Sequence, residues 1–513
     1  MQKSPGLNRF SQNQFQPLLI AMDSGQHFLK VIFIRTVRRQ SQPPAEPIGP
    51  INLQFPIYVP FASAFCRATL PIGSEWVRMV AAVKDILRQS VDVAIVGGGI
   101  VGCSTAWHLA QKNLSVAVFE RGRVASEQSS RAWGFIRQQG RNEAEVPLAA
   151  EANEIWIELS RRFGAASTEF VQGGILVPAE TEKDEERVVD GHEVARRFGL
   201  ATTILNSAGI EELLPEINGR WRSGLYTPGD AHGNPLLSTQ TIADAARAAG
   251  AKIYENTPVY SVERSAGRPN SVMTADGRCE AKAIVLANGI GAPILAAPLG
   301  HKLPIQIVKS SVGRTVPAAP FTKVAMWGPN VAFRPGLDGR FTLGNGYRGV
   351  GVDYEMTVDS LRGLSHFLPA YRNNWRLLRL TLGPDFFHQL YARTSRAAAV
   401  KALPEPRPNE RKVLSNLESF RELFPHLGTI ALETMWAGRL DMTPDVIPII
   451  DRPRADEDLF IAAGFSGHGF ALGPAIGKQL SEWITEGSPS LDLTPFRLAR
   501  FREGIVHKPQ KAL

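Results

Sequence analysis

The sequence predicts an α/β fold. Two segments far apart in the chain, 91–122 and 459–484, share one order of elements: an apolar run typical of a buried strand, a glycine turn, and a helix. In the first segment a second strand follows the helix, and such a βαβ unit places its strands parallel in one sheet. The chain of 513 residues also exceeds one ordinary domain, so we expect two or more.

The first glycine turn has the spacing of a dinucleotide site. Gly97, Gly99 and Gly102 form GxGxxG directly after the first strand, where they permit the turn, the approach of a pyrophosphate and close helix packing. The helix then presents its unpaired N–H groups to the phosphates. Glu120 closes the second strand about 20 residues on, as expected for a carboxylate that binds ribose hydroxyls. The motif does not distinguish FAD from NAD.

The second glycine turn favours a flavin. Residues 464–470, GFSGHGF, are not part of a simple NAD fingerprint, and their glycines would let backbone N–H groups approach a flat ring. The following helix would direct its positive end at the pyrimidine carbonyl, where negative charge appears on reduction. His468 in this turn is either a site residue or a buried residue at the helix entry.

Composition narrows the function classes. The net charge is +8, but residues 1–78 carry +5 of it, and Lys and Arg elsewhere alternate with Asp and Glu, so we expect no nucleic-acid partner. Cys66, Cys103 and Cys279 form no zinc spacing, and Cys103 is expected to be a small buried apolar residue. No apolar run is long enough for a transmembrane segment. We expect a cytoplasmic protein, either free or peripheral to the inner membrane.

The remaining chain has weaker signals. Residues 1–78 lack a sustained period and contain the breaker cluster QPPAEPIGP, so we interpret them as a disordered extension or as upstream sequence wrongly included in the reading frame. A docking segment for a partner is the alternative. Other expected elements are helices at 143–163 and 236–249, strands at 282–292, 331–335 and 340–344, and an amphipathic region near 358–400.

Several motifs together resemble one known family. GGGIVG, VFERG, SSRAWGFIRQQGR (129–141), VLANG (285–289), WAGRLDMTPDVIPII (436–450) and GFSGHGFALGP (464–474) are similar to the D-amino-acid oxidase and sarcosine oxidase (DAO) family of FAD enzymes. The resemblance covers about residues 90 to 500. Within the family, the motifs look closest to bacterial D-amino-acid dehydrogenase-like and opine oxidase-like members.

The resemblance implies a fold and a domain plan. A Rossmann-like FAD-binding domain is assembled from discontinuous segments, and an α+β substrate domain with a mixed or antiparallel sheet covers the flavin. The FAD-binding segments are 90–150, 225–298 and 431–500, and the substrate domain takes 151–224 and 299–430. The cofactor-binding residues that follow are Gly97, Gly99, Ile100, Val101, Gly102, Glu120, Arg121, Ser129, Ser130, Arg131, Gly134, Asn288, Gly289, Gly464, Ser466, Gly467, His468 and Gly469.

The chain departs from the family pattern at three positions. Related sarcosine oxidases attach FAD to a Cys near the TPD motif, but no Cys follows Cys279, so we expect noncovalent FAD. They also place a Lys after GHGF, where this chain has Ala471. Glycine oxidases carry an Arg at the position of Leu440, whereas Arg439 comes one place earlier. Substrate recognition must therefore be built differently.

Four arginines are candidates for binding a substrate carboxylate. Arg137 occupies a position similar to a carboxylate-binding Arg of sarcosine oxidases, and a guanidinium can hold a carboxylate by two parallel hydrogen bonds. A structural ion pair or a contact to FAD phosphate is the alternative. Arg141 and Arg334 join Arg137 and His468 as candidate catalytic residues, although for Arg334 and Arg439 a structural role is favoured. Trp133, Phe135 and Trp436 are interpreted as core packing rather than a substrate cage.

The resemblance implies oxidation of the C–N bond of a small amine or amino acid to an imine by hydride transfer to flavin. D-amino acids, N-alkyl amino acids and opines are the candidate substrates, and O2 or a quinone-linked chain is the acceptor. A partner subunit is an open alternative. Two rival interpretations are a flavoenzyme acting on a larger substrate, such as a modified-tRNA side chain, and a non-catalytic flavoprotein that serves as a scaffold. We expect no metal site.

Overall fold

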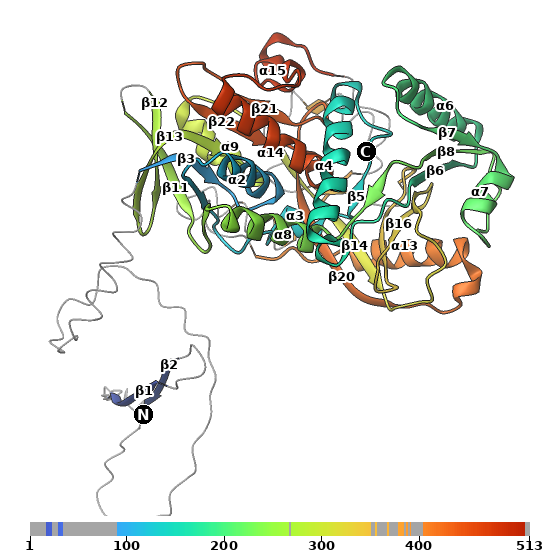
Figure 1. The fold of residues 1–513 in the computed structure, drawn as a ribbon. Coiled ribbons are helices and arrows are strands. Elements are labelled where there is room, and N and C mark those ends of the chain that lie inside the picture. The colour runs from blue at the N-terminus through green and yellow to red at the C-terminus, as the bar shows by residue number, and fades with distance from the viewer. Residues whose placement is uncertain are drawn as a thin grey trace, which may run out of the picture. The chain divides into compact units, whose positions relative to one another are not determined.

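The computed structural model describes residues 90–265, 268–349 and 404–507, with shorter pieces at 17–22, 29–33, 354–356, 367–368, 378–383, 386–387 and 390. The chain divides into two compact units, Met1–Pro71 and Ile72–Leu513, which are described separately (Figure 1). In the first unit, β1 (Pro17–Met22) and β2 (Leu29–Phe33) pair antiparallel. Apart from these strands, the prediction for residues 1–78 lies outside the described residues, as does most of that for 358–400.

A sheet with a parallel centre and antiparallel strands at its margins is the first of two layers in the second unit. Its central strand β3 is a run of Val, Ile and Ala buried almost throughout, as is usual for parallel strands covered by helices. The strand order is β10, β4, β3, β13, β12, β11, and β22 also pairs with β13. The bounds are β3 Ser90–Val96, β4 Val116–Phe119, β10 Lys252–Tyr254, β11 Val259–Ser265, β12 Arg268–Thr274, β13 Gly277–Leu286, β21 Ile449–Asp451 and β22 Leu459–Ala463.

Helices from both ends of the second unit pack together beside this sheet. α2 (Ile100–Gln111) and α14 (Gly469–Glu486) lie side by side in Figure 1 although more than 350 residues separate them. Glycine permits this approach, because a Cβ on Gly477 would lie 2.5 Å from the Cβ of Ser104.

Among the described residues, no helix is long and apolar enough to cross a membrane. The other helices beside the sheet are α4 Val146–Phe163, α8 Pro235–Ala248 and α9 Ala292–Ala296.

A mixed sheet is the second layer. Its strand order is β19, β18, β14, β17, β16, β15, β6, β8, β7, and β20 also pairs with β14. Most pairs are antiparallel, but β15 with β6 and β18 with β19 are parallel. The strand bounds are β6 Ile175–Ala179, β7 Thr203–Leu205, β8 Ser223–Thr227, β14 Gln306–Thr315, β15 Ala325–Trp327, β16 Val331–Pro335, β17 Phe341–Asn345, β18 Tyr354–Met356, β19 Leu378–Leu380 and β20 Leu432–Met442.

An aromatic core fastens α13 (Glu410–Leu423) to the second sheet. Phe420 on this helix lies 5.3 Å from Phe333 and 5.1 Å from Phe341, measured between ring centroids, and all three rings are buried. The remaining described α-helices and strands are α3 Gln128–Arg131, β5 Phe135–Ile136, α5 Ala165–Thr168, α6 Glu182–Arg197, α7 Ser207–Leu213, β9 Ala231–His232 and α15 Arg500–Glu503.

The predicted α/β fold class is confirmed, and each sheet takes strands from widely separated parts of the chain. β8 spans the predicted boundary between residues 224 and 225, and β20 lies near the start of the predicted segment 431–500. Both strands belong to the second sheet. β20 does so because it pairs with β14 along almost its whole length. α4 packs instead beside the first sheet, since its apolar face, including Trp156, lies against α14.

Candidate functional site

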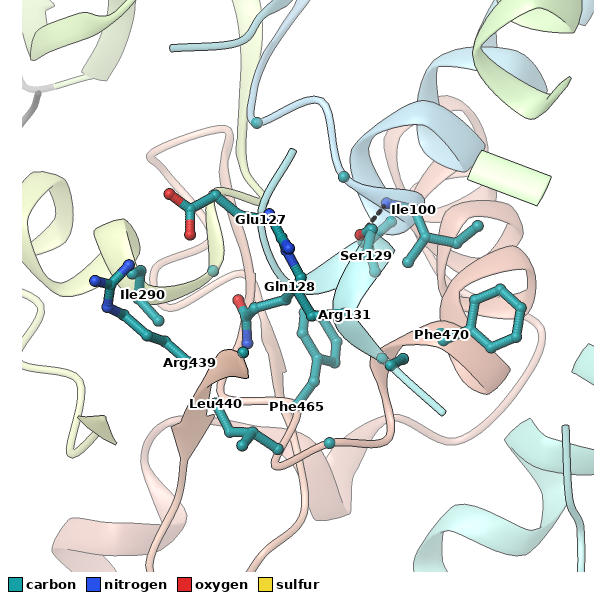
Figure 2. Close-up of a pocket in the computed structure, with 18 of the residues that line it drawn as sticks. Ile100, Glu127, Gln128, Ser129, Arg131, Ile290, Arg439, Leu440, Phe465 and Phe470 are labelled. Atoms are coloured by element: carbon teal, nitrogen blue, oxygen red, sulfur yellow. Dashed lines mark hydrogen bonds between the residues drawn. The ribbon is translucent and has the colours of Figure 1, made fainter. Parts of the chain in front are cut away.

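A pocket begins at the carboxyl ends of the first sheet's strands and extends to the second sheet. It is lined by segments that the chain supplies from many places (Figure 2). These are the β3–α2 turn, the end of β4 and residues 125–141, the start of β11, the turn at 287–291 and α9, parts of β14, β15, β18 and β20, and the turn into α14.

The β3–α2 turn has room only for glycine at two of its three motif positions. Gly97 has φ +112°, and a Cβ there would lie 2.4 Å from the carbonyl oxygen of Ala287. A Cβ on Gly102 would lie 2.0 Å from the carbonyl oxygen of Gly97. At Gly99 the nearest atom would be the Ser129 hydroxyl, at 3.0 Å. The turn therefore keeps backbone N–H groups accessible to a ligand at the start of α2.

Ser129 lies at this same helix start. Its hydroxyl accepts a hydrogen bond from the N–H of Ile100 at 2.9 Å, drawn as the dashed line in Figure 2. Both residues line the pocket. The remaining N–H groups of the first turn and the helix dipole favour an anion here, so the position suits a pyrophosphate.

Glu120 is held in place by backbone donors. Its two carboxylate oxygens accept hydrogen bonds from the N–H groups of Gly98 and Gly122, each at 2.7 Å. Burial raises the pKa of this carboxyl, against the effect of those two donors. The carboxylate lines the pocket at the end of β4, where a ribose is expected. Together with the glycine cradle, it shows that the residues present fit FAD.

The turn into α14 is tied to distant segments by one carboxylate. Asp441 on β20 accepts hydrogen bonds from the N–H of Gly464 and from the side chain of Gln128, both at 2.7 Å. The turn itself uses left-handed backbone, since Gly467 has φ +87° and Ser466 has φ +52°. Asp441 thereby aligns three segments around the pocket.

Arg137 carries positive charge into the other end of the pocket. Its guanidinium carbon lies 4.5 Å from the ring centroid of Trp327, in cation–π contact. The Nη1 atom is buried and finds no hydrogen-bond partner among the described residues. Burial, and then the neighbouring Arg141, lower the pKa of Arg137 to about 9, so the group stays charged at neutral pH. Arg141 lies next to it and donates its Nε–H to the Arg137 carbonyl at 3.1 Å.

Two buried carboxyl groups lie near this positive charge. Glu145 is fully buried and lies 2.8 Å from Nδ1 of His468, which lines the pocket. Asp230 is also fully buried and accepts a hydrogen bond from the N–H of Gln138 at 2.8 Å. Burial raises the pKa of Asp230 to about 7, although Arg137 pulls in the opposite direction. The structure thus brings together Arg137, Arg141 and His468 from the predicted catalytic set.

Arg334 is separated from that group. It does not line the pocket, and its Nε–H donates to the carbonyl of Trp133 at 2.7 Å. Arg334 therefore holds the backbone of a lining residue, which agrees with the structural role favoured for it. Arg439 lines the pocket but donates to the carbonyl of Pro404 at 2.6 Å. Figure 2 places it across the pocket from Phe470.

Most predicted cofactor residues line the pocket. Three do not: Gly102 packs under the turn, Ser130 donates to the carbonyl of Glu127, and Gly464 is bonded to Asp441. Those that do are Gly97, Gly99, Ile100, Val101, Glu120, Arg121, Ser129, Arg131, Gly134, Asn288, Gly289, Ser466, Gly467, His468 and Gly469.

Sequence reasoning missed part of the aromatic wall. Trp133 and Phe135 pack against a buried cluster, as expected of core residues, but they also line the pocket, whereas Trp436 does not line it. Trp327 and Tyr354 also line it, on short strands that carry no motif. Gln128 stands directly before the SSR motif, which was the one available signal for it. Within the part of the chain that the structure describes, no cluster of His, Cys, Asp and Glu could hold a metal ion.

Comparisons with known proteins agree with this geometry. Glycine oxidase of Geobacillus kaustophilus (strain HTA426) is 25% identical over 81% of this chain and 98% of that protein. 4-Methylaminobutanoate oxidase (formaldehyde-forming) of Paenarthrobacter nicotinovorans is 26% identical over 82% of this chain, which spans about half (47%) of that relative. The structure of L-amino acid deaminase from Proteus myxofaciens in complex with anthranilate has the same fold, with a TM-score of 0.74, 24% identity and coverage of 81% and 94%.

The family comparison covers most of the chain. Residues 92–483 match the family "DAO: FAD dependent oxidoreductase", and they contain both glycine turns and the whole pocket between them. This chain therefore belongs to the DAO family of FAD-dependent oxidoreductases, which confirms the family, the cofactor and the enzyme class that its motifs predicted.

Proposed function

We propose that this enzyme oxidises the C–N bond of a small amine that carries a carboxylate: a D-amino acid, an N-alkyl amino acid or an opine. The product is an imine, which water then hydrolyses. Two relatives are named for oxidation of such compounds, glycine and 4-methylaminobutanoate. The observation that carries the proposal is the buried Arg137 in the pocket wall.

Arg137 has the environment of an anion site. A buried guanidinium loses hydration, and an unpartnered N–H in that state costs about 1–3 kcal/mol or more. A substrate carboxylate would supply the missing acceptor for Nη1 and could bond the guanidinium in its own plane. Trp327 lies against one face of the guanidinium and so restricts its orientation. The Arg137 guanidinium is therefore already oriented to bind a planar anion such as a carboxylate.

The neighbouring residues suit a small substrate with an apolar part. Trp133, Phe135 and Tyr354 line the same region as Arg137, so apolar surface lies close to the cationic group. The carboxylate contact fixes one end of the substrate, and these rings exclude water from the other. Bound FAD supplies the chemistry of the reaction by accepting a hydride from the substrate carbon.

Anaerobic mixing with a panel of D-amino acids, N-methyl amino acids and opines tests this proposal. We expect at least one class to bleach the visible absorbance of the flavin. The matching amine without its carboxylate should bleach it far more slowly, because Arg137 would then remain unpaired. The proposal fails if no compound bleaches the flavin, or if the carboxylate makes no difference.

We also propose that FAD is held noncovalently. The described lining contains no Cys, and the whole sequence has none after Cys279. Precipitation with acid should release all of the yellow colour into the supernatant. Colour retained in the pellet would indicate a covalent bond to another side chain.

A further inference from the structure

Glu145 and His468 form a pair at the pocket wall. Glu145 lies where η1 (Glu143–Glu145) meets α4, and His468 is the N-cap residue of α14. Their contact, between Oε1 and Nδ1, is 2.8 Å long. Glu145 is fully buried, whereas the imidazole lines the pocket and keeps 17% of its surface exposed. One partner is therefore inside the protein and the other faces the ligand space.

This pairing selects one tautomer of the imidazole. A carboxylate only accepts hydrogen bonds, so Nδ1 must carry the proton that it donates to Glu145. Nε2, on the opposite edge of the ring, is then a lone-pair acceptor. No described residue donates a hydrogen bond to it. The exposed edge of the ring thus offers the pocket a base.

Burial and the neighbouring charges together favour a neutral imidazole and an ionised Glu145. Burial lowers the pKa of His468, and Arg141 and Arg137 lower it further, against the opposing effect of Glu145. For Glu145, burial opposes ionisation, but His468 and the two arginines together lower its pKa. Asp230 is the other carboxylate near the arginines. Further along α14 the facing charges are Lys478 and Glu482, and Glu151 faces them from α4.

We propose that the Glu145–His468 pair removes a proton from the bound substrate's ammonium group; this inference rests on the proposed function. Hydride leaves the carbon readily only when the nitrogen has a free lone pair. In the proton transfer the substrate N–H bond breaks and an Nε2–H bond forms, so charge moves from the substrate to the imidazole. His468 is the catalytic residue in this step. Glu145 is a positioning residue that fixes the tautomer and stabilises the imidazolium.

The test compares Glu145→Gln with Glu151→Gln. Both changes remove one negative charge from the contact between α4 and α14, but Glu151 bonds Lys478 and Gln479 away from the pocket. The rate of flavin bleaching is measured anaerobically against pH with a substrate of the panel. Well below the pKa of the substrate's amino group, Glu145→Gln should be slower by about 100-fold, in the range of general base catalysis. Glu151→Gln should behave as wild type.

Measurements at high pH distinguish a catalytic effect of Glu145 from a purely structural one. The free substrate is then already neutral and needs no base, so the rate of Glu145→Gln should approach that of wild type. A defect that is constant with pH would overturn the proposal and assign Glu145 a structural role. If Glu145→Gln does not fold, His468→Asn replaces it, because Asn is a favoured N-cap and keeps the start of α14. The same pH dependence is expected for it.

A second measurement does not depend on a substrate. In the FAD-loaded protein labelled with ¹⁵N-histidine, the signal lost in His468→Asn identifies His468. At neutral pH its Nδ1 should be protonated and its Nε2 unprotonated, and the opposite tautomer would overturn the inference. If wild type bleaches with a substrate and Glu145→Gln keeps the wild-type pH profile, this inference alone fails. If no panel compound bleaches wild type, the proposed function fails and the inference with it.

Discussion

The two ends of the pocket are built in different ways. At the end beside β3 and β4 the backbone forms the surface, with N–H groups at the start of α2 and glycines that leave them accessible. At the other end side chains form it, with Arg137, Trp327 and His468 brought from three distant segments. The first end takes these polar contacts from one stretch of the chain, residues 97–129. The second contains buried charges that depend on partners elsewhere in the fold.

This difference separates the end of the pocket that determines the fold and cofactor binding from the end that determines substrate specificity. A backbone surface binds what every member of a cofactor class shares, such as a pyrophosphate, and cannot be altered without disturbing the fold. A side-chain surface can change its chemistry while the sheets remain. We therefore expect substitutions at the first end to abolish FAD binding and those at the second to change catalysis in protein that still binds FAD.

The largest effect is expected for Gly102→Val. Its Cβ would lie 2.0 Å from the Gly97 carbonyl oxygen and 3.3 Å from Ile95, so backbone would have to move. We expect a cost of more than about 3 kcal/mol in unfolding free energy and loss of bound FAD. Flavin absorbance per protein and the thermal midpoint measure both. Gly99→Ala is the matched control, because it meets only the rotatable Ser129 hydroxyl and should retain the fold. Normal FAD content in Gly102→Val would refute this account of the turn.

The second effect in size is expected for Arg137→Ala. Loss of a buried partner for a carboxylate costs about 2–5 kcal/mol, so kcat/KM should fall by about 30- to 4000-fold. Arg137→Lys should also be impaired, because it keeps the charge but lacks the planar fork. FAD content should stay at the wild-type level, and exposed Arg161→Ala serves as the control. Loss of FAD in Arg137→Ala would instead place this arginine at the cofactor.

A smaller effect, on stability alone, is expected for Asp230→Asn. Burial raises the pKa of Asp230 from its ordinary value to about 7, so the folded state holds a proton that the unfolded state releases. The resulting stability is fully present near pH 4 and is lost as the pH rises through 7. Asn imitates the protonated acid at every pH, so the variant should equal wild type near pH 4.

At pH 8 the Asp230→Asn variant should be more stable than wild type by at most about 4 kcal/mol. Urea unfolding at pH 4, 6 and 8 measures the difference. Exposed Asp190→Asn on α6 is the control for loss of a carboxylate. A variant that is equally or less stable than wild type at pH 8 would show that Asp230 is stabilised as an anion by the arginines.

Sequence alone predicted the first end of the pocket well, for a physical reason. Gly97 and Gly102 occupy positions where the backbone geometry excludes any side chain, so the residue type itself reports the structure. Glu120 follows at a fixed spacing because the length of α2 fixes where β4 ends. At this end the positions of the glycines and of the carboxylate follow from local backbone geometry, so a sequence motif is enough to locate them.

The second end could be predicted only in part. Arg137 was found through its place in a motif, but its contact with Trp327 depends on how β15 packs near residues almost 200 positions earlier in the chain. Glu145 was not singled out, because its role appears only when α4 and α14 come together. The pairing of β20 with β14 was also not predictable, since a strand's partner is set by the tertiary fold rather than by its own composition.

The smallest effect is expected at Trp327. It tests whether substrate binding depends on the packing of Trp327 against Arg137 or only on the charge of Arg137. The cation–π contact with Arg137 is worth about 0.5–2 kcal/mol, so Trp327→Leu should raise KM by about 2- to 30-fold. Trp327→Phe should lie between Leu and wild type, because a smaller ring attracts the guanidinium less. Trp221→Leu is the matched control: that indole is equally buried but lies in the core of the second sheet, away from the pocket. It should lower the thermal midpoint and leave KM unchanged. Equal KM values for the two Leu variants would mean that Arg137 needs no aromatic support, and that its charge alone holds the substrate.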